Sequence, residues 1–300
     1  MAKNEVLAVD LGQSGCRIQQ GDLLITSDRG KLAGESPVEA LTAIFESLQK
    51  IEADIVSLSC TGFNGIVNDP EKYLDLCSQY FGATQVAVID DGLAGFVGAL
   101  SGHNGVVLSI GGGVVAVGGR DGQYAHRDGL GSTFGDEGSG FWIGKLAITK
   151  ALGLRQGRGD DPEMLAYFAD ECAAYDNLIV KNASDAATLA IRTAKKVLDA
   201  ADAGVSTATA IVDEGAYLLA QTVVATWIGC GGNRLDSPEI VIKGGPALNH
   251  SYSTKIALEI NARMPNAVIV ESVGDNLDGA TWIATNQKQD APPLLLWAVK

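Results

Sequence analysis

The chain has 300 residues, 46% of them hydrophobic, and a formal net charge of −14 at pH 7. This length suits one large or two medium domains, and this apolar content is ample for their cores. Nucleic acids and anionic membranes bind basic surfaces, so the acidic balance argues against both as partners.

The cysteines and histidines argue against a metal cluster. Five cysteines are scattered along the chain without a C-x-x-C spacing or a neighbouring histidine, which is typical of reduced thiols. The chain has three histidines, too few for a multi-histidine site. The sequence begins without an apolar leader, and no apolar run approaches the ~20 residues of a membrane helix. We therefore expect a cytoplasmic protein.

The first hundred residues predict alternating strands and helices. Three apolar runs joined by small-residue turns predict strands at 6–10, 16–19 and 23–26. Residues 36–39 read Ser-Pro-Val-Glu, a capping box with proline in the first turn, which predicts the start of a helix. The other elements expected here are strands at 54–60 and 85–89 and helices at 37–50, 70–81 and 92–100.

The second half repeats the three-strand opening. It has a strand at 106–110, three glycines, a strand at 114–117, a glycine-rich turn at 118–122 and a returning strand. A helix that opens with two acids at 136–137 then begins a mostly helical insert, about 141–230. The last elements expected are strands at 239–242 and 267–270, a helix at 246–264 and a helix from 274. Because the opening occurs twice, we predict two related domains, 1–104 and 105–300, with the last segment a candidate to pack back on the first.

Two common phosphate-binding motifs fail in this sequence. No Walker A loop is present. Gly111, Gly113 and Ala116 have the spacing of a dinucleotide fingerprint, but that fingerprint must open a helix, and residues 114–117 favour a strand. Three glycines between strands instead predict a tight hairpin whose N–H groups can face an anion.

Several short motifs follow one another in an informative order. They are VDLGQSGCR (9–17), the aspartate at 91, VLSIGGG (107–113), GDEGSGFWIG (135–144) and VIKGGPALN (241–249). With them the chain resembles the N-acetylglucosamine kinase/BadF–BadG–BcrA–BcrD ATPase family of the actin/hexokinase/heat-shock superfamily, over essentially its whole length. The resemblance implies an α/β fold with two actin-like (ribonuclease H-like) domains, each a mixed sheet flanked by helices, and a cleft between them.

The resemblance assigns ATP to glycine-rich turns from both domains. Asp10 matches the family's carboxylate near Mg²⁺, which it would hold through a water molecule. The other positions implied for ATP are the phosphate contacts Gly12, Gln13, Ser14, Gly111, Gly112 and Gly113, and the adenosine contacts Gly244 and Gly245.

The resemblance also implies which residues act on the acceptor. Asp91 matches the catalytic base, which would take the proton of the attacking sugar hydroxyl, and Asp90 is the alternative. Asp136 matches a sugar contact. The expected sugar-binding set is completed by three loop residues, Thr61, Asn64 and Gly131.

Each assignment has a structural alternative. Asp10 could be a turn acid, and Asp91 could be a helix N-cap. Asp136 could complement a helix dipole. His126 reads as a solvated hairpin residue.

The chain departs from the family pattern mainly on the acceptor side. Residues 111–114 read Gly-Gly-Gly-Val where relatives carry Gly-Thr-Gly-Ser, so two hydroxyls are lost from the phosphate loop. Residues 129–132 lack the usual tryptophan, and 27–31 lack the usual sugar-contacting asparagine. These changes leave the sugar open.

We expect ATP- and Mg²⁺-dependent phosphorylation of the 6-hydroxyl of an amino sugar, N-acetylglucosamine first and glucosamine as the alternative. A BadF-type activator ATPase would need an iron–sulfur cluster between subunits, which the scattered cysteines argue against. A non-catalytic sugar or nucleotide sensor would lack the base. Asp91 argues against it, whereas the altered loop at residues 111–114 leaves it open. A homodimer, common among relatives, stays open.

Overall fold

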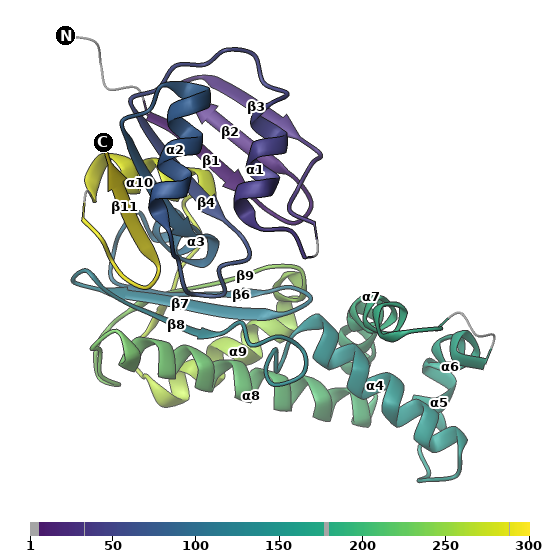
Figure 1. Cartoon of the computed structure of the whole chain (residues 1–300). Helices are drawn as coiled ribbons and strands as arrows, with labels where there is room; N and C mark the ends of the chain where they lie inside the picture. The colour runs from purple at the N-terminus through teal and green to yellow at the C-terminus, as the bar shows by residue number, and fades with distance from the viewer. Residues whose placement is uncertain (1–5, 33, 177–179, 288) are drawn as a thin grey trace.

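The computed structural model describes residues 6–32, 34–176, 180–287 and 289–300, which form two β-sheets flanked by helices (Figure 1). Residues 177–179 of the expected helical insert lie outside the described residues. Two mixed sheets flanked by helices are what the sequence predicted for the fold class, and that prediction is confirmed.

The first sheet has six strands, in the order β11 (Leu295–Val299), β5 (Gln85–Asp90), β4 (Ile55–Cys60), β1 (Val6–Leu11), β2 (Cys16–Gln20) and β3 (Leu23–Ser27). β1, β4 and β5 are parallel, so their carboxyl ends meet at one edge. β2, β3 and β11 run antiparallel to their neighbours. Asp10, Thr61 and Asp91 all lie at or just after this shared edge, which is where ligands bind in parallel α/β sheets.

The second sheet has five strands, in the order β10 (Val268–Ile269), β9 (Glu239–Lys243), β6 (Gly105–Ile110), β7 (Val114–Arg120) and β8 (Gln123–Asp128). β9 is parallel to β6, with Ser109 opposite Lys243. The glycine loop 111–113 and the Gly244–Gly245 turn therefore leave the same edge of this sheet.

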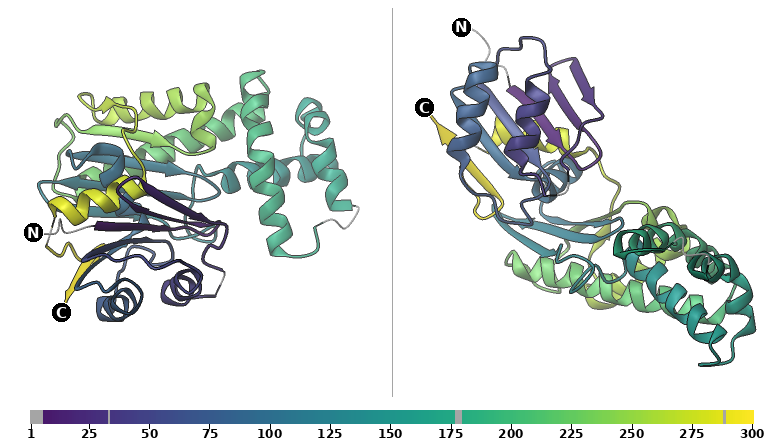
Figure 2. Two further views of the ribbon diagram at one scale, coloured as in Figure 1. Left: turned by 90° about the horizontal axis from the view of Figure 1, so that it is seen from above. Right: turned by 45° about the vertical axis from the view of Figure 1, so that its right-hand side comes forward.

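The helices form layers on the faces of the two sheets. The outer face of the first sheet is covered by α1 (Pro37–Phe45) and α2 (Pro70–Phe81), and the outer face of the second by α8 (Ser206–Gly229) and α9 (His250–Arg263). Between the sheets lie α3 (Asp91–Leu100) and α10 (Asn276–Asn286). Figure 2 shows the remaining helices projecting to one side, α4 (Gly140–Arg155), α5 (Pro162–Tyr167), α6 (Ala169–Asp176) and α7 (Ala183–Asp202).

The layer between the sheets has one continuous apolar core. It joins Ala87 and Ile89 of the first sheet, Leu93 and Phe96 of α3, and Val241 of the second sheet, all buried. Helices α3 and α10 cross at close range because both carry glycine at the crossing. A Cβ on Gly98 would lie 1.8 Å from the Asp275 carbonyl oxygen.

Four details differ from the sequence prediction. Helix α1 ends at Phe45 instead of about residue 50. β7 continues through Gly118 and Gly119, and the turn that follows is Asp121–Gly122. Glycine is needed within the strand because helix α3 packs closely on it: a Cβ on Gly119 would lie 2.7 Å from Phe96. The acids at 136–137 precede helix α4, which is capped by Ser139.

The fourth difference is the end of the chain. The sequence predicted no strand after the helix from residue 274, but residues 295–299 form strand β11, which pairs antiparallel with β5. Within the described residues no helix is both long and apolar enough to cross a bilayer.

Candidate active site

Two adjacent carboxylates, Asp90 and Asp91, stand at the junction of β5 and α3. Asp90 is buried and caps the helix: Oδ1 accepts from the Gly92 N–H and Oδ2 from the Gly65 N–H, both at 3.0 Å. Both oxygens of Asp90 are therefore used to hold the backbone. Asp91 begins the helix and is not the N-cap that the structural alternative suggested.

Asp91 has the electrostatics of a proton acceptor. Burial, together with the negative charges of Asp90 and Asp10, raises the pKa of Asp91 to about 6, although a hydrogen bond with the Thr61 side chain acts in the opposite direction. A carboxyl group with a pKa close to neutrality can take up and release a proton at physiological pH. The structure thus gives the role of helix cap to Asp90 and not to Asp91.

Asp10 lies at the end of β1 within a network of polar side chains. Its Oδ1 accepts from the Ser59 hydroxyl at 3.0 Å and its Oδ2 from Arg17 Nη2 at 2.7 Å. Arg17 also donates from Nη1 to Asp275, at 2.6 Å, just before α10. Arg17 therefore ties the end of β1 to the start of α10, the helix that crosses α3.

Asp10 suits a magnesium ion that keeps its water ligands. Both of its oxygens already accept hydrogen bonds, so direct coordination would compete with Arg17. Mg²⁺ usually retains several waters and takes other ligands from substrate phosphates. Among the described residues no cluster of three or more His, Cys, Asp or Glu side chains could hold a metal alone. A water-mediated contact is the arrangement that these donors fit.

Backbone N–H groups point to two anion-binding turns. In the first, Gly12 N–H bonds to the Gly15 carbonyl, whereas the N–H groups of Gln13 and Ser14 have no partner in the described part of the chain. In the second, Gly111 N–H bonds to the Gly113 carbonyl, and the N–H groups of residues 112 and 113 have none there. Consecutive unpaired N–H groups form concave sites for anions.

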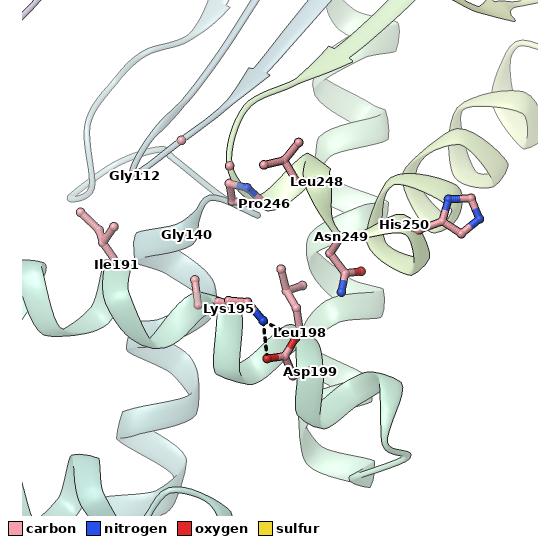
Figure 3. Close-up of a pocket in the computed structure, with 13 residues that line it drawn as sticks. Gly112, Gly140, Ile191, Lys195, Leu198, Asp199, Pro246, Leu248, Asn249 and His250 are labelled. Carbon is pink, nitrogen blue, oxygen red and sulfur yellow. Dashed lines mark hydrogen bonds and ion pairs between the residues drawn. The ribbon is translucent and has the colours of Figure 1, made fainter. Parts of the chain in front are cut away.

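A pocket of about 600 Å³ lies beside the second turn, a volume typical of small-ligand sites. Figure 3 shows α7 on one side of it and the segment from η1 (Pro246–Leu248) into α9 on the other. Ile191, Leu198 and Leu248 supply apolar surface, and an ion pair between Lys195 and Asp199 lies at α7. Gly111, Gly112 and Gly245 line the pocket, so predicted phosphate and adenosine contacts meet here.

Gly244 does not line this pocket, and glycine is required at this position by the backbone conformation. Its φ is +111°, and a Cβ there would lie 2.0 Å from the Ile110 carbonyl oxygen. The close approach holds the turn after β9 against the end of β6.

The acceptor-side residues lie in loops from both halves of the chain. Asp136 is buried and accepts from the Val114 N–H at 2.8 Å, and a Cβ on Gly113 would lie 2.6 Å from its carboxylate. Asp136 is therefore beside the glycine turn at residues 111–113. Burial raises its pKa, against the effect of the Val114 hydrogen bond. Asn64 and Gly131 are exposed, both with positive φ.

Two polar residues of this region, His126 and Lys243, were not predicted from the sequence. His126 is half-buried, and its ring lies 3.2 Å from a Cβ on Gly65 and 2.9 Å from one on Gly129, so it is not a solvated hairpin residue. Burial lowers its pKa although the Asp90 carboxylate raises it. In β8, Ala125 is buried and alternates with more exposed neighbours. This alternation did not indicate that the next residue, His126, packs against a loop of the other sheet.

A sequence model of the BadF/BadG/BcrA/BcrD ATPase family matches residues 8–281. The chain belongs to this family. The family resemblance drawn from the five motifs is thereby confirmed. Among curated proteins, no sequence matches this member of the ATPase family significantly.

Solved structures of low sequence identity share the fold of this BadF-family protein. A protein of Chromobacterium violaceum, provisionally named an N-acetylglucosamine kinase, is 20% identical with a TM-score of 0.64, over 92% of this chain and 97% of its own. A protein of Porphyromonas gingivalis with the same provisional name is 15% identical, with a TM-score of 0.60 over 94% and 99%. A ROK family glucokinase of Streptomyces griseus, solved with glucose and AMPPNP, is 15% identical, with a TM-score of 0.54 over 94% and 99%.

Proposed function

We propose that this BadF-family protein is an ATP-dependent sugar kinase. The observation that carries the proposal is Asp91, a buried carboxylate with a raised pKa beside the helix cap Asp90, at the edge of the first sheet from which the turn at residues 12–14 also leaves. Two solved proteins of the same fold are provisionally named N-acetylglucosamine kinases, and a third was solved with a sugar and an ATP analogue.

The residues divide the work of phosphoryl transfer. Asp91 takes the proton of the attacking sugar hydroxyl, whose oxygen forms the new bond to the γ-phosphorus while the bond to the ADP oxygen breaks. The unpaired N–H groups of Gln13, Ser14, Gly112 and Gly113 bind phosphate oxygens. A magnesium ion, when bound, neutralises phosphate charge. Its waters would be held by Asp10.

The nucleoside occupies the pocket of about 600 Å³. The purine packs between the apolar side chains of α7 and the turn at Gly245, where a glycine leaves space. Closure of the units 1–104 and 105–300 excludes water from the transferred phosphate. Helix α10 and strand β11 pack with the first of these units.

The acceptor is an amino sugar, phosphorylated at its 6-hydroxyl. We favour N-acetylglucosamine, with Thr61, Asn64, Gly131 and Asp136 as contacts. Glucosamine is the alternative, since its ammonium group would gain from a nearby carboxylate such as Asp136. The protein acts in the cytoplasm, and a homodimer remains part of the proposal.

The test is an ADP-release assay with ATP and Mg²⁺ over glucose, glucosamine, N-acetylglucosamine and N-acetylmannosamine. Turnover with one amino sugar is expected. Asp91→Asn should lower kcat by about 10²- to 10⁴-fold while ATP binding persists. Asp75→Asn, an exposed carboxylate on α2, is the matched control and should leave turnover unchanged.

Loss of turnover in Asp91→Asn should not reflect unfolding. Above pH 6 the fold holds a carboxylate whose charged form burial disfavours, and asparagine removes that cost, so the variant should be at least as stable as the wild type. Full turnover in Asp91→Asn would refute the base assignment. ATP binding without turnover on any sugar would favour the sensor or the activator ATPase.

A further inference from the structure

Lys243 is the last residue of β9, and its side chain lies between the two sheets. Side chains alternate along a strand, and Val241, two residues earlier, belongs to the core between the sheets. Ile240, of the opposite parity, packs into the core on the α8–α9 side. Lys243 therefore extends from the second sheet toward α3 and the carboxylates of the first.

The contacts of Lys243 bear this out. Its Nζ lies 3.5 Å from the Gly95 carbonyl oxygen on α3. Gly95 has no side chain, and a Cβ there would lie 3.2 Å from Nζ and 2.9 Å from Asn276 Oδ1. Asn276 in turn donates to the Asp91 carbonyl oxygen at 3.2 Å. Gly95 on α3 thus leaves room for the ammonium group of Lys243. Asn276, beside the same glycine, connects this place to the backbone of the candidate base, Asp91.

The electrostatic surroundings of Lys243 are acidic. Burial lowers its pKa, whereas the carboxylates of Asp275, Asp10 and Asp91 raise it. Arg17, the neighbouring cation, is held by two carboxylates at 2.7 and 2.6 Å. Within the described residues Lys243 forms no ion pair, and its long hydrogen bond to Gly95 leaves donors of the ammonium group for a ligand.

We propose that Lys243 binds the terminal phosphates of ATP and stabilises the charge on the transferred phosphoryl group. The inference rests on the proposed kinase function. A triphosphate that approaches Asp10 and Asp91 meets like charge, and backbone N–H groups carry only partial charges. Lys243 supplies a full positive charge from the sheet that holds the second phosphate turn, opposite Ser109 of β6. Lysine binds phosphate groups through a point charge at the end of a flexible side chain.

A series of three ligands tests this assignment. The dissociation constants of adenosine, ADP and ATP are measured by calorimetry with Mg²⁺ and compared between the wild type and the variants; this series is called the ligand ladder below. Lys243→Met should weaken ATP by about 10- to 100-fold, the size expected for a charged hydrogen bond, and ADP by less. Adenosine affinity should stay within about twofold. Lys243→Arg should recover part of the ATP affinity. Lys255→Met is the matched control, because Lys255 pairs with Asp213 on α8, away from the carboxylates.

The ladder separates phosphate binding from a structural role. If Lys243 only neutralises the carboxylates to hold the sheets together, Lys243→Met lowers the unfolding temperature and changes the three affinities equally, and the inference fails. An unchanged ladder also refutes it. If Lys243→Met does not fold, Lys243→Gln keeps a polar tip and gives the same comparison.

The two proposals fail separately. If the wild-type protein phosphorylates no sugar but the ladder is steep, the kinase function is wrong and Lys243 is a phosphate contact of an ATP-binding protein. If turnover is normal in Lys243→Met and the ladder is flat, the kinase function stands and this inference is wrong.

Discussion

Asp90 and Asp91 are adjacent and identical, but their surroundings in the fold differ. Both oxygens of Asp90 accept backbone hydrogen bonds, which fix the start of α3. Asp91, one position later, faces the other polar residues of the site and stays available. The sequence alone predicted Asp91 as the catalytic base but kept Asp90 as the alternative. Hydrogen-bond partners from the loop at Gly65 separate them, and those partners are distant in sequence.

The raised pKa of Asp91 predicts the pH dependence of turnover. The base must be unprotonated, so activity should be full above pH 7 and fall as the pH drops through about 6. Between pH 7 and pH 5, kcat/KM for the sugar should decrease about tenfold, since a single proton is involved. Initial rates in buffers of constant ionic strength measure this. A profile that stays flat down to pH 5 would contradict the assignment.

The turn after β9 depends on one glycine much more than on its neighbour. Gly244 has positive φ and lies against the Ile110 carbonyl, whereas Gly245 has helical φ and nothing within 4 Å of a Cβ. The pair therefore separates backbone constraint from pocket space.

Gly244→Ala should destabilise the protein by about 2–4 kcal/mol, since the new Cβ adds both strain and overlap. Gly245→Ala should change stability by less than about 0.5 kcal/mol. Urea unfolding of both variants measures the difference. Equal stability of the two variants would mean that the turn adapts at Gly244, contrary to this account.

The two sheets are joined through the crossing of α3 and α10. Glycines at the crossing, Gly98 on α3 and Gly279 on α10, let each backbone touch the other: a Cβ on Gly279 would lie 1.9 Å from the Ala94 carbonyl oxygen. The same two helices present Asp91, Gly95 and Asn276 to the site. A change at the crossing should therefore affect both stability and the position of the candidate base.

Gly279→Ala should lower the free energy of unfolding by about 2–3 kcal/mol, the usual cost of overpacking. Hydrogen exchange should show reduced protection in both β1 and β6, because the helices lie between their sheets. Thr281→Ala, an exposed position on the same helix, should change stability by less than about 0.5 kcal/mol. Loss of protection confined to one sheet would show that the layers unfold independently.

Most elements were predictable from the sequence because their signals are local. Alternation and apolar runs gave β1 to β6 and β9, and the capping box at Ser36 and Glu39 forms as predicted. The order of the motifs identified the family. Glycine placement predicted turns at residues 12–14 and 111–113, and within the described residues these turns carry unpaired N–H groups.

Other features depended on which distant segments meet. The short apolar run 295–299 has no partner in its own neighbourhood, and it becomes a strand only because β5 offers a free edge. Gly118 and Gly119 read as a turn, but close packing against Phe96 and Thr226 keeps them in β7. Local periodicity records which face of an element is buried, not what lies opposite that face.

The sequence by itself determined most of the elements and the fold class, and it predicted the aspartates and glycines of the candidate site. The tertiary structure alone decided that Asp90 caps a helix while Asp91 stays available, that Arg17 holds Asp10, and that Lys243 lies near the carboxylates of the other sheet. The physical reason is that charge, burial and hydrogen bonding act through space, and the groups that act on these residues come from elements far along the chain.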